Sequence, residues 1–150
     1  MKLAKNISFY IVLATIITCV GYYLESEFLF TYLQKNLIGL LLTLLAINIA
    51  SLGLIASKIQ DIVLQLPGFD FSETIKEMKL SLKEQIALIG TAIVTLLLQD
   101  SEKICFEYKE HVGNVVLVAI LIYAINILWD TGKAVFIIIE NIQNLNNNEE

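Results

Sequence analysis

Apolar residues gather into four long runs along this chain, and most polar residues lie in the segments between them. A bilayer core of about 30 Å requires roughly 20 apolar residues in a helix, whereas apolar runs in soluble helices are usually shorter. Four such runs among 150 residues leave little sequence for a separate soluble domain. The pattern therefore predicts one all-α domain, a polytopic membrane protein with four transmembrane helices, at residues 7–24, 37–57, 80–99 and 112–129.

The third run has the shortest uninterrupted apolar stretch. This stretch, Ile86–Leu98, is only about 20 Å long as a helix. The span reaches full thickness by including Leu80 and Leu82, with the Lys83 side chain extending to the head groups. If this run did not cross, the C-terminus would lie outside the cell.

Residues 58–85, between the second and third runs, form the longest polar segment inside the chain. Apolar residues at helical spacing continue the second run until Pro67-Gly68, which ends the helix. The motifs Asp70-x-x-Glu73 and Thr74-x-x-Glu77 both fit capping boxes, so a new helix is expected to start near Asp70. The sequence thus predicts a short cytoplasmic helical hairpin between spans two and three.

Two aromatic residues, Phe69 and Phe71, lie at the tip of this predicted hairpin. One expectation is that they cover the hairpin or lie on the membrane surface. The other is that they form a docking point for a cytosolic partner protein, because exposed aromatic residues are frequent anchors in interfaces.

Lysine is the only basic residue type besides one histidine, and its distribution predicts the orientation, because positively charged loops stay in the cytoplasm. With the N-terminus inside, the cytoplasmic segments hold seven lysines and the outer segments hold three. We therefore expect a multi-pass protein of the cell inner membrane with both termini cytoplasmic. The seven are Lys2, Lys5, Lys58, Lys76, Lys79, Lys83 and Lys133, and the three are Lys35, Lys103 and Lys109.

Polar side chains within the runs are the candidate functional residues, because an amide in lipid needs a partner or water. Asn48 and Asn126 are expected either to hydrogen-bond between helices or to line a hydrated path. In the second case this pore lies within one bundle or at an oligomer axis. Thr43 and Thr95 are further candidate pore residues.

Asp130 and Lys133 have i,i+3 spacing and can pair on one helix. They are expected to act either as an interfacial anchor pair beside Trp129 or as a charged gate at the cytoplasmic mouth. The fourth helix either ends near Trp129, with Ala134–Ile142 along the inner surface, or continues as one long helix. The polar tail, residues 141–150, is expected to fray.

The composition argues against several classes of function. The net charge of -5 and the absence of arginine argue against nucleic acid and against a bidentate phosphate site. His111 is the only histidine, and there is no Gly-rich phosphate loop and no Cys pair at metal-ligand spacing. We therefore expect no catalytic, cofactor-binding or metal-binding residues and no enzymatic activity.

Small residues recur in the second run as Ala46-x-x-x-Ala50 and Gly53-x-x-x-Ser57. Such pairs let helices approach closely in lipid. A homo-oligomer in the lipid bilayer is therefore expected.

Two segments carry a resemblance to known proteins, Asn48-Ile49-Ala50-Ser51-Leu52-Gly53 in the second span and Trp129-Asp130-Thr131-Gly132-Lys133 near the end. Together with the short chain and the hairpin, they make the chain similar to small four-span bacterial membrane proteins of anti-phage defence. Examples are the membrane subunit of the Kiwa system and the membrane component of Rex exclusion. The similarity covers most of the chain as architecture and matches no specific motif. It implies a membrane sensor or effector that acts with a cytosolic partner, often by altering permeability.

The leading hypothesis is a non-enzymatic membrane component of an anti-phage defence or abortive-infection system. It would oligomerise and either alter membrane permeability or sense membrane perturbation. The alternatives are a small channel or transporter subunit, and a membrane anchor that recruits a cytosolic enzyme through the hairpin tip.

Overall fold

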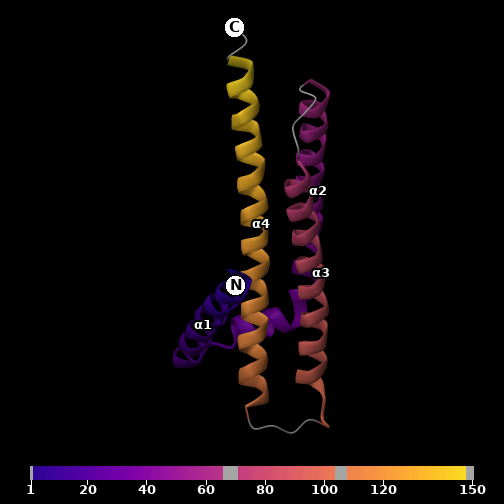
Figure 1. Cartoon of the computed structure of the whole chain (residues 1–150). Helices are drawn as coiled ribbons and strands as arrows, with labels where there is room; N and C mark the ends of the chain where they lie inside the picture. Colours follow the sequence, from indigo (N-terminus) through magenta and orange to yellow (C-terminus); the bar gives the residue numbers. More distant parts are fainter. Residues whose placement is uncertain (1, 66–70, 104–107, 148–150) are drawn as a thin grey trace.

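The computed structural model describes residues 2–65, 71–103 and 108–147. These residues form four α-helices and no strand, which confirms the all-α prediction (Figure 1). The helices are α1 (Lys2–Tyr23), α2 (Phe28–Gln65), α3 (Ser72–Asp100) and α4 (Lys109–Asn147).

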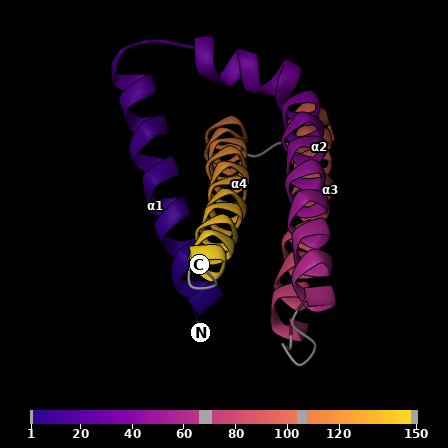
Figure 2. The same ribbon diagram turned by 90° about the horizontal axis from the view of Figure 1, so that it is seen from above.

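Helix α4 is the centre of the molecule, because it packs against each of the other three helices. Helices α2 and α3 also pack against each other and run in opposite directions (Figure 1). Helix α1 lies obliquely across α4 and packs mainly against it (Figures 1 and 2). The long part of α2, α3 and α4 thus form a three-helix bundle with α1 on its side.

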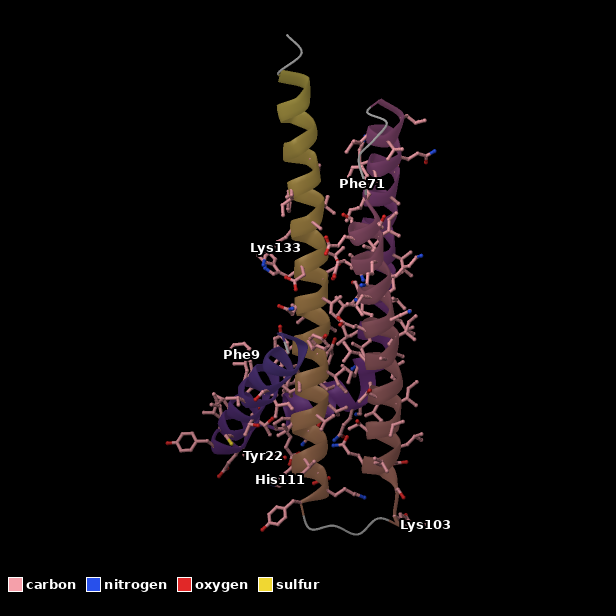
Figure 3. The ribbon with its side chains drawn as sticks, in the orientation of Figure 1. Phe9, Tyr22, Phe71, Lys103, His111 and Lys133 are labelled. Atoms are coloured by element: carbon pink, nitrogen blue, oxygen red, sulfur yellow. The ribbon has the colours of Figure 1, made fainter. Side chains whose placement is uncertain are left out.

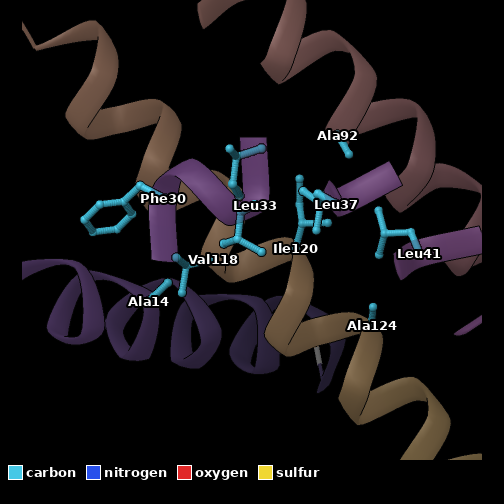
Figure 4. Close-up of a cluster of buried hydrophobic side chains, with 10 residues drawn as sticks. Ala14, Phe30, Leu33, Leu37, Leu41, Ala92, Val118, Ile120 and Ala124 are labelled. Carbon is cyan, nitrogen blue, oxygen red and sulfur yellow. The ribbon is translucent and has the colours of Figure 1, made fainter. Parts of the chain in front are cut away.

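Helix α2 is not straight. Its first turns run crosswise to the long stem that pairs with α3 (Figure 2). Leu33, Leu37 and Leu41 are fully or almost fully buried and follow one another at helical spacing on the inner face. They belong to the main apolar core together with Ala14 of α1 and Val118 of α4 (Figure 4). The main core therefore ties the crosswise start of α2 to the other helices.

Helix α1 ends in a tight turn. Glu25 has a φ of 51°, in the left-handed region, and the Ser26 N–H donates to the Gly21 carbonyl at 3.0 Å. A residue in this conformation just past a helix is a common way to satisfy the last carbonyl groups. The turn sends the chain from α1 directly into α2.

The helical hairpin is present, and α2 and α3 extend beyond the predicted spans. Leu52, Ile55 and Ile59 of α2 form a second buried cluster, against which Met78 of α3 packs. Helix α3 begins at Ser72 with no side-chain cap, so the Thr74-x-x-Glu77 motif lies inside the helix and its predicted capping role is wrong. Asp70 lies outside the described residues.

The fourth helix follows the second of its two predicted courses. It continues from Lys109 to Asn147 without a break at Trp129. The expectation of a frayed tail is therefore corrected for residues 141–147, which are helical. The main chain of this end has a regular hydrogen-bonded conformation in spite of its polar side chains.

Three described helices, not four, are long and apolar enough to cross a membrane: Phe28–Leu64, Ser72–Asp100 and Lys109–Ile137. The third predicted span, which seemed short in sequence, is part of a continuous helix and meets the criterion. The first does not, because the described apolar part of α1 is only Ser8–Tyr23. At about 1.5 Å per residue this part is about 24 Å long, less than a bilayer core of about 30 Å. The prediction of four membrane-length helices is corrected accordingly.

Candidate functional site

Two clusters of polar side chains lie inside the apolar bundle, and the first is centred on Asn48 of α2. The Asn48 side chain is completely buried. Its Nδ2 donates to Gln85 Oε1 at 2.8 Å and to Ser81 Oγ at 3.0 Å, both on α3. Ser81 Oγ in turn lies 3.5 Å from Thr131 Oγ1 of α4. This Asn48 cluster (Asn48, Ser81, Gln85 and Thr131) therefore connects the three long helices.

The Asn48 cluster is incompletely satisfied. Among the described residues, neither Asn48 Oδ1 nor Gln85 Nε2 has a hydrogen-bond partner, although both atoms are buried. The amides of Asn48 and Gln85 share one hydrogen bond, and this leaves one acceptor (Asn48 Oδ1) and one donor (Gln85 Nε2) unpaired. Such groups are costly in an apolar environment unless water reaches them.

The second cluster is centred on Asn114, near the start of α4. Asn114 Nδ2 donates to Tyr22 Oη of α1 at 3.0 Å. Asn114 Oδ1 accepts from Gln99 Nε2 of α3 at 3.2 Å and from Gln34 Nε2 of α2 at 3.4 Å. One side chain of α4 thus meets a residue from each of the other helices in this Asn114 cluster (Tyr22, Gln34, Gln99 and Asn114).

Aromatic contacts strengthen the Asn114 cluster on the side of α1. The Tyr22 ring stacks on His111 with 4.4 Å between the centroids (Figure 3). The Tyr22 ring also stacks on Phe30, with 5.2 Å between the centroids. The only histidine of the chain therefore serves as a stacking partner for α1. Within the described ranges, no group of three or more His, Cys, Asp or Glu side chains is placed to hold a metal ion.

The two clusters are separated by apolar core on α3 and α4. On α4, the buried residues Leu117 and Ile120 lie between Asn114 and Thr131, and on α3 Ala92 lies between Gln85 and Gln99. The 17 positions from Asn114 to Thr131 correspond to about 25 Å along a helix. A single described chain therefore has no continuous polar path from one cluster to the other.

Comparison with protein families, curated proteins and solved structures found no match for this chain. Its function is therefore argued from the geometry of its own residues.

The two asparagines singled out in the sequence have different surroundings. Asn48 makes the interhelical hydrogen bonds described above. Asn126 is half-buried, and its Nδ2 donates to Asp130 Oδ2 of the same helix at 3.1 Å. The predicted pair of Asp130 and Lys133 is present at 3.6 Å on an exposed surface, and the Lys133 ammonium lies 5.2 Å from the Trp129 ring centre (Figure 3). A gating role for this pair stays a prediction.

Asn126 and Asp130 border a groove of about 360 Å³ between α3 and α4. Glu77 and Glu84 of α3 also line it, as do the hydroxyl groups of Ser81 and Thr131 from the Asn48 cluster. The groove therefore brings carboxylates and the buried polar cluster to the same part of the bundle, near its hairpin end.

The two candidate pore threonines bond within their own helices. The exposed Thr43 donates to the Gly39 carbonyl at 2.9 Å, and Thr95 donates to the Thr91 carbonyl at 2.8 Å. Neither lines the groove between α3 and α4. The structure thus does not bring Thr43 and Thr95 together with Asn48 or Asn126.

Of the two predicted docking residues, Phe71 is half-buried and packs against the Leu52, Ile55 and Ile59 cluster. This packing agrees with the expectation that it covers the hairpin. Phe69 lies outside the described residues. Docking of a partner at the hairpin tip stays a prediction.

Sequence reasoning missed most members of the Asn114 cluster and the amide of Gln85. Asn114 lies inside the fourth apolar run, and Gln99 closes the third. The available signal was the same as for Asn48: an amide within or beside an apolar run needs a partner. Applied to glutamine as well as asparagine, this rule would have identified both clusters.

Proposed function

We propose that the chain is a non-enzymatic integral membrane protein that self-associates through the outer face of α2 and alters the permeability of the membrane. In this proposal α2, α3 and α4 cross the bilayer, and the hairpin and C-terminus are cytoplasmic. The hairpin and C-terminal segments hold five lysines (Lys58, Lys76, Lys79, Lys83 and Lys133), against three (Lys35, Lys103 and Lys109) at the other ends of these helices.

A stripe of small residues on α2 is the observation that carries the proposal. Its members follow at alternating steps of four and three residues, and all are exposed in the single chain. A Cβ atom added at Gly39 or Gly53 would meet nothing within 4 Å. At about 100° per residue, the stripe lies opposite the face that buries Leu41, Asn48 and Leu52. The small-residue stripe consists of Gly39, Thr43, Ala46, Ala50, Gly53 and Ser57.

Such a stripe favours association of one helix with a second copy. Between helices in lipid there is no hydrophobic driving force, so close backbone approach at small residues supplies much of the attraction. A mean spacing of 3.5 residues also matches a left-handed pair of helices crossing at about 20°. The rest of the exposed face carries large apolar residues such as Leu42 and Ile49, which suit lipid.

One chain by itself has no continuous polar path, so a path across the membrane requires more than one copy. Association of copies therefore supports a permeability function. The groove lined by Glu77, Glu84 and Asp130 provides polar surface at the hairpin end of each copy. In the proposed assembly, ions or water enter along these grooves, and the remaining path forms between copies. The resemblance to anti-phage defence proteins suggests that phage infection is the condition that opens it.

The test compares two alanines on α2. Ala50 belongs to the small-residue stripe, whereas Ala56 is exposed but lies about 100° around the helix from the stripe. Ala50→Leu is expected to abolish crosslinking between copies and to reduce depolarisation at least tenfold in phage-infected cells carrying a potential-sensitive dye. Ala56→Leu is expected to leave both unchanged.

Two results would contradict the proposal. If Ala50→Leu and Ala56→Leu behave alike, the stripe is not the contact between copies. If wild-type cells never depolarise, with or without infection, the permeability function is wrong even where the copies associate.

A further inference from the structure

The lysines of α3 lie on one face of its first half. Lys76, Lys79 and Lys83 follow one another at steps of three and four residues, and all three side chains are exposed. At about 100° per residue, they lie within a sector of about 60° around the helix. Within the described ranges none of the three forms an ion pair, whereas Lys58 of α2 and Lys133 of α4 are each paired with a carboxylate. This lysine stripe (Lys76, Lys79 and Lys83) is therefore an unpaired positive surface at the hairpin end of the bundle.

The carboxylates of the same segment lie on a different side of α3. Glu77 and Glu84 line the groove between α3 and α4, and they lie about 110° around the helix from the middle of the lysine stripe. Gln85, which is buried and accepts a hydrogen bond from α2, lies about 150° from it. Helix α3 thus separates its charges: the acids face the groove with α4, and the lysines face away from both neighbouring helices.

The lysine stripe continues the side of α3 that faces lipid in the proposed membrane arrangement. Beyond Lys83 the same face carries Ile86, Val94 and Leu97, whose exposed fractions in the single chain are 60%, 54% and 66%. Large apolar side chains on the outside of a helix bundle suit the acyl chains of the bilayer. The face changes from apolar to basic at Lys83, as the surroundings of a helix change from acyl chains to phosphate groups. This continuity points to the membrane itself as the partner of the lysines.

The height of the stripe also fits the head-group layer. The seven positions from Lys76 to Lys83 cover about 10 Å along the helix. The head groups occupy about 5 to 7 Å on each side of the hydrocarbon core, and the flexible stem of a lysine lets its ammonium group extend toward them. All three ammonium groups can therefore reach phosphates of one leaflet.

We propose that the lysine stripe binds the anionic head groups of acidic phospholipids, whose acyl chains lie against Ile86 and the apolar face that follows it. With the orientation proposed above, these lipids belong to the cytoplasmic leaflet. Lysines act as point charges and lack the bidentate fork of arginine, so the stripe selects lipids by negative charge and not by head-group shape. The binding requires that α3 crosses the bilayer, but it does not require association through α2.

The experiment uses the full-length protein in vesicles of phosphatidylethanolamine and phosphatidylglycerol, followed by extraction in mild detergent. Native mass spectrometry then counts each lipid that remains bound. The wild type is expected to retain phosphatidylglycerol in preference to phosphatidylethanolamine. The triple variant Lys76→Gln, Lys79→Gln and Lys83→Gln is expected to retain at least fivefold less phosphatidylglycerol, because one lysine near an anionic surface already contributes about fivefold. Retention of the zwitterionic lipid should not change.

Three lysines at the other ends of the long helices provide the matched control. Lys35, Lys103 and Lys109 belong to α2, the α3–α4 loop and α4, so their replacement by glutamine removes the same total charge without removing a stripe. This variant is expected to retain phosphatidylglycerol like the wild type. Replacement of the stripe by three arginines keeps the charge and should also preserve retention.

Ala50→Leu, which changes the proposed contact between copies on α2, is likewise expected to leave lipid retention unchanged. Failure of the permeability proposal and failure of the lipid proposal are therefore distinguishable.

The lipid proposal is overturned if the stripe variant remains helical by circular dichroism and retains as much phosphatidylglycerol as the wild type. It is also overturned if the two glutamine variants lose this lipid equally, because net charge and not the stripe is then responsible. Carbodiimide crosslinks between copies that require the stripe, with phosphatidylglycerol retention unchanged, would show that carboxylates of a second copy take the place of the lipid.

Discussion

Each amide side chain among apolar residues must find a partner, because water is scarce there. Asn48 and Asn114 find theirs on neighbouring helices, whereas Asn126 donates to Asp130 one turn along its own helix. The same residue type therefore has different consequences for stability, depending on which side of the helix it occupies.

Asn48→Leu is expected to destabilise the bundle by about 1 to 2 kcal/mol, because Gln85 and Ser81 both lose their donor in a buried place. The free energy of unfolding is measured by titrating the protein from mild detergent into a denaturing one. Asn126→Leu is the control, and we expect a change of about 0.5 kcal/mol or less because its bond is local and half-exposed. Equal losses in the two variants would show that the Asn48 cluster does not join the helices.

The double variant Asn48→Leu with Gln85→Leu provides a second measure of the same contact. When both partners become apolar, neither amide of this pair is left buried without the other, so the double variant should lose less stability than the sum of the single variants. Additive losses would mean that the two amides do not interact.

At the residue scale, the sequence allowed Asn48 to be identified but not its partners. The length of an apolar run does not reveal which of its positions face a neighbouring helix. Gln85 and Asn114 are set in their clusters by the packing of α3 and α4, which depends on long-range contacts. The pairing of Asp130 with Lys133 was predictable because it depends only on spacing within one helix.

At the scale of elements, α1 is the helix with the fewest attachments, since it packs mainly against α4. Its attachment includes the Tyr22 stack on His111, the hydrogen bond from Asn114, and the Tyr10 contact with Tyr123. Elements with few contacts open more readily than the rest of a fold. We expect α1 to exchange its amide hydrogens faster than the three long helices do.

Tyr22→Leu should increase amide exchange in residues 8–23 at least tenfold while leaving α3 and α4 unchanged, because it removes the stack and the Asn114 bond together. Hydrogen exchange read by mass spectrometry gives the result for each helix. The neighbouring Tyr23 is 87% exposed, so Tyr23→Leu should have no effect on exchange. If both variants speed exchange equally, Tyr22 does not hold α1 in place.

The helices themselves were predictable from run length and from the break at Pro67-Gly68, and the hairpin followed from both. The bend of α2 and the oblique course of α1 were not predictable from the sequence, because they arise where Leu33, Leu37 and Ala14 meet α4. The small residues of α2 were recognised, but their outward direction is set by the opposite face, which contains Asn48 and Leu52. The periodicity of small residues identifies a stripe on α2 but does not show which partner covers it.

For the whole molecule, the antiparallel order of α2, α3 and α4 places the hairpin and the C-terminus at the same end of the bundle (Figure 1). The lysine count predicts that this end lies in the cytoplasm. Reporter fusions after Asp70 and Glu150 are therefore expected to read inside, and a fusion after Glu107 outside. The opposite result for all three would invert the proposed orientation of the bundle.

The side of the membrane on which the N-terminus lies tests whether α1 crosses, separately from the other helices. The described apolar part of α1 is shorter than the other spans, but Lys2 and Lys5 lie at its start, and positive charge there favours the cytoplasm. The complete helix, Lys2–Tyr23, has 22 residues, or about 33 Å, and its oblique course (Figure 1) shortens the depth that it covers, so we expect that α1 does not cross the bilayer. A tag before Lys2 and a fusion after Glu27 are thus both expected outside. Lys2 and Lys5 then lie outside, but they are farther from the start of α2 than the roughly 15–20 residues within which lysines set the orientation of a span. If the tag before Lys2 reports inside and the fusion after Glu27 reports outside, α1 crosses as a fourth span.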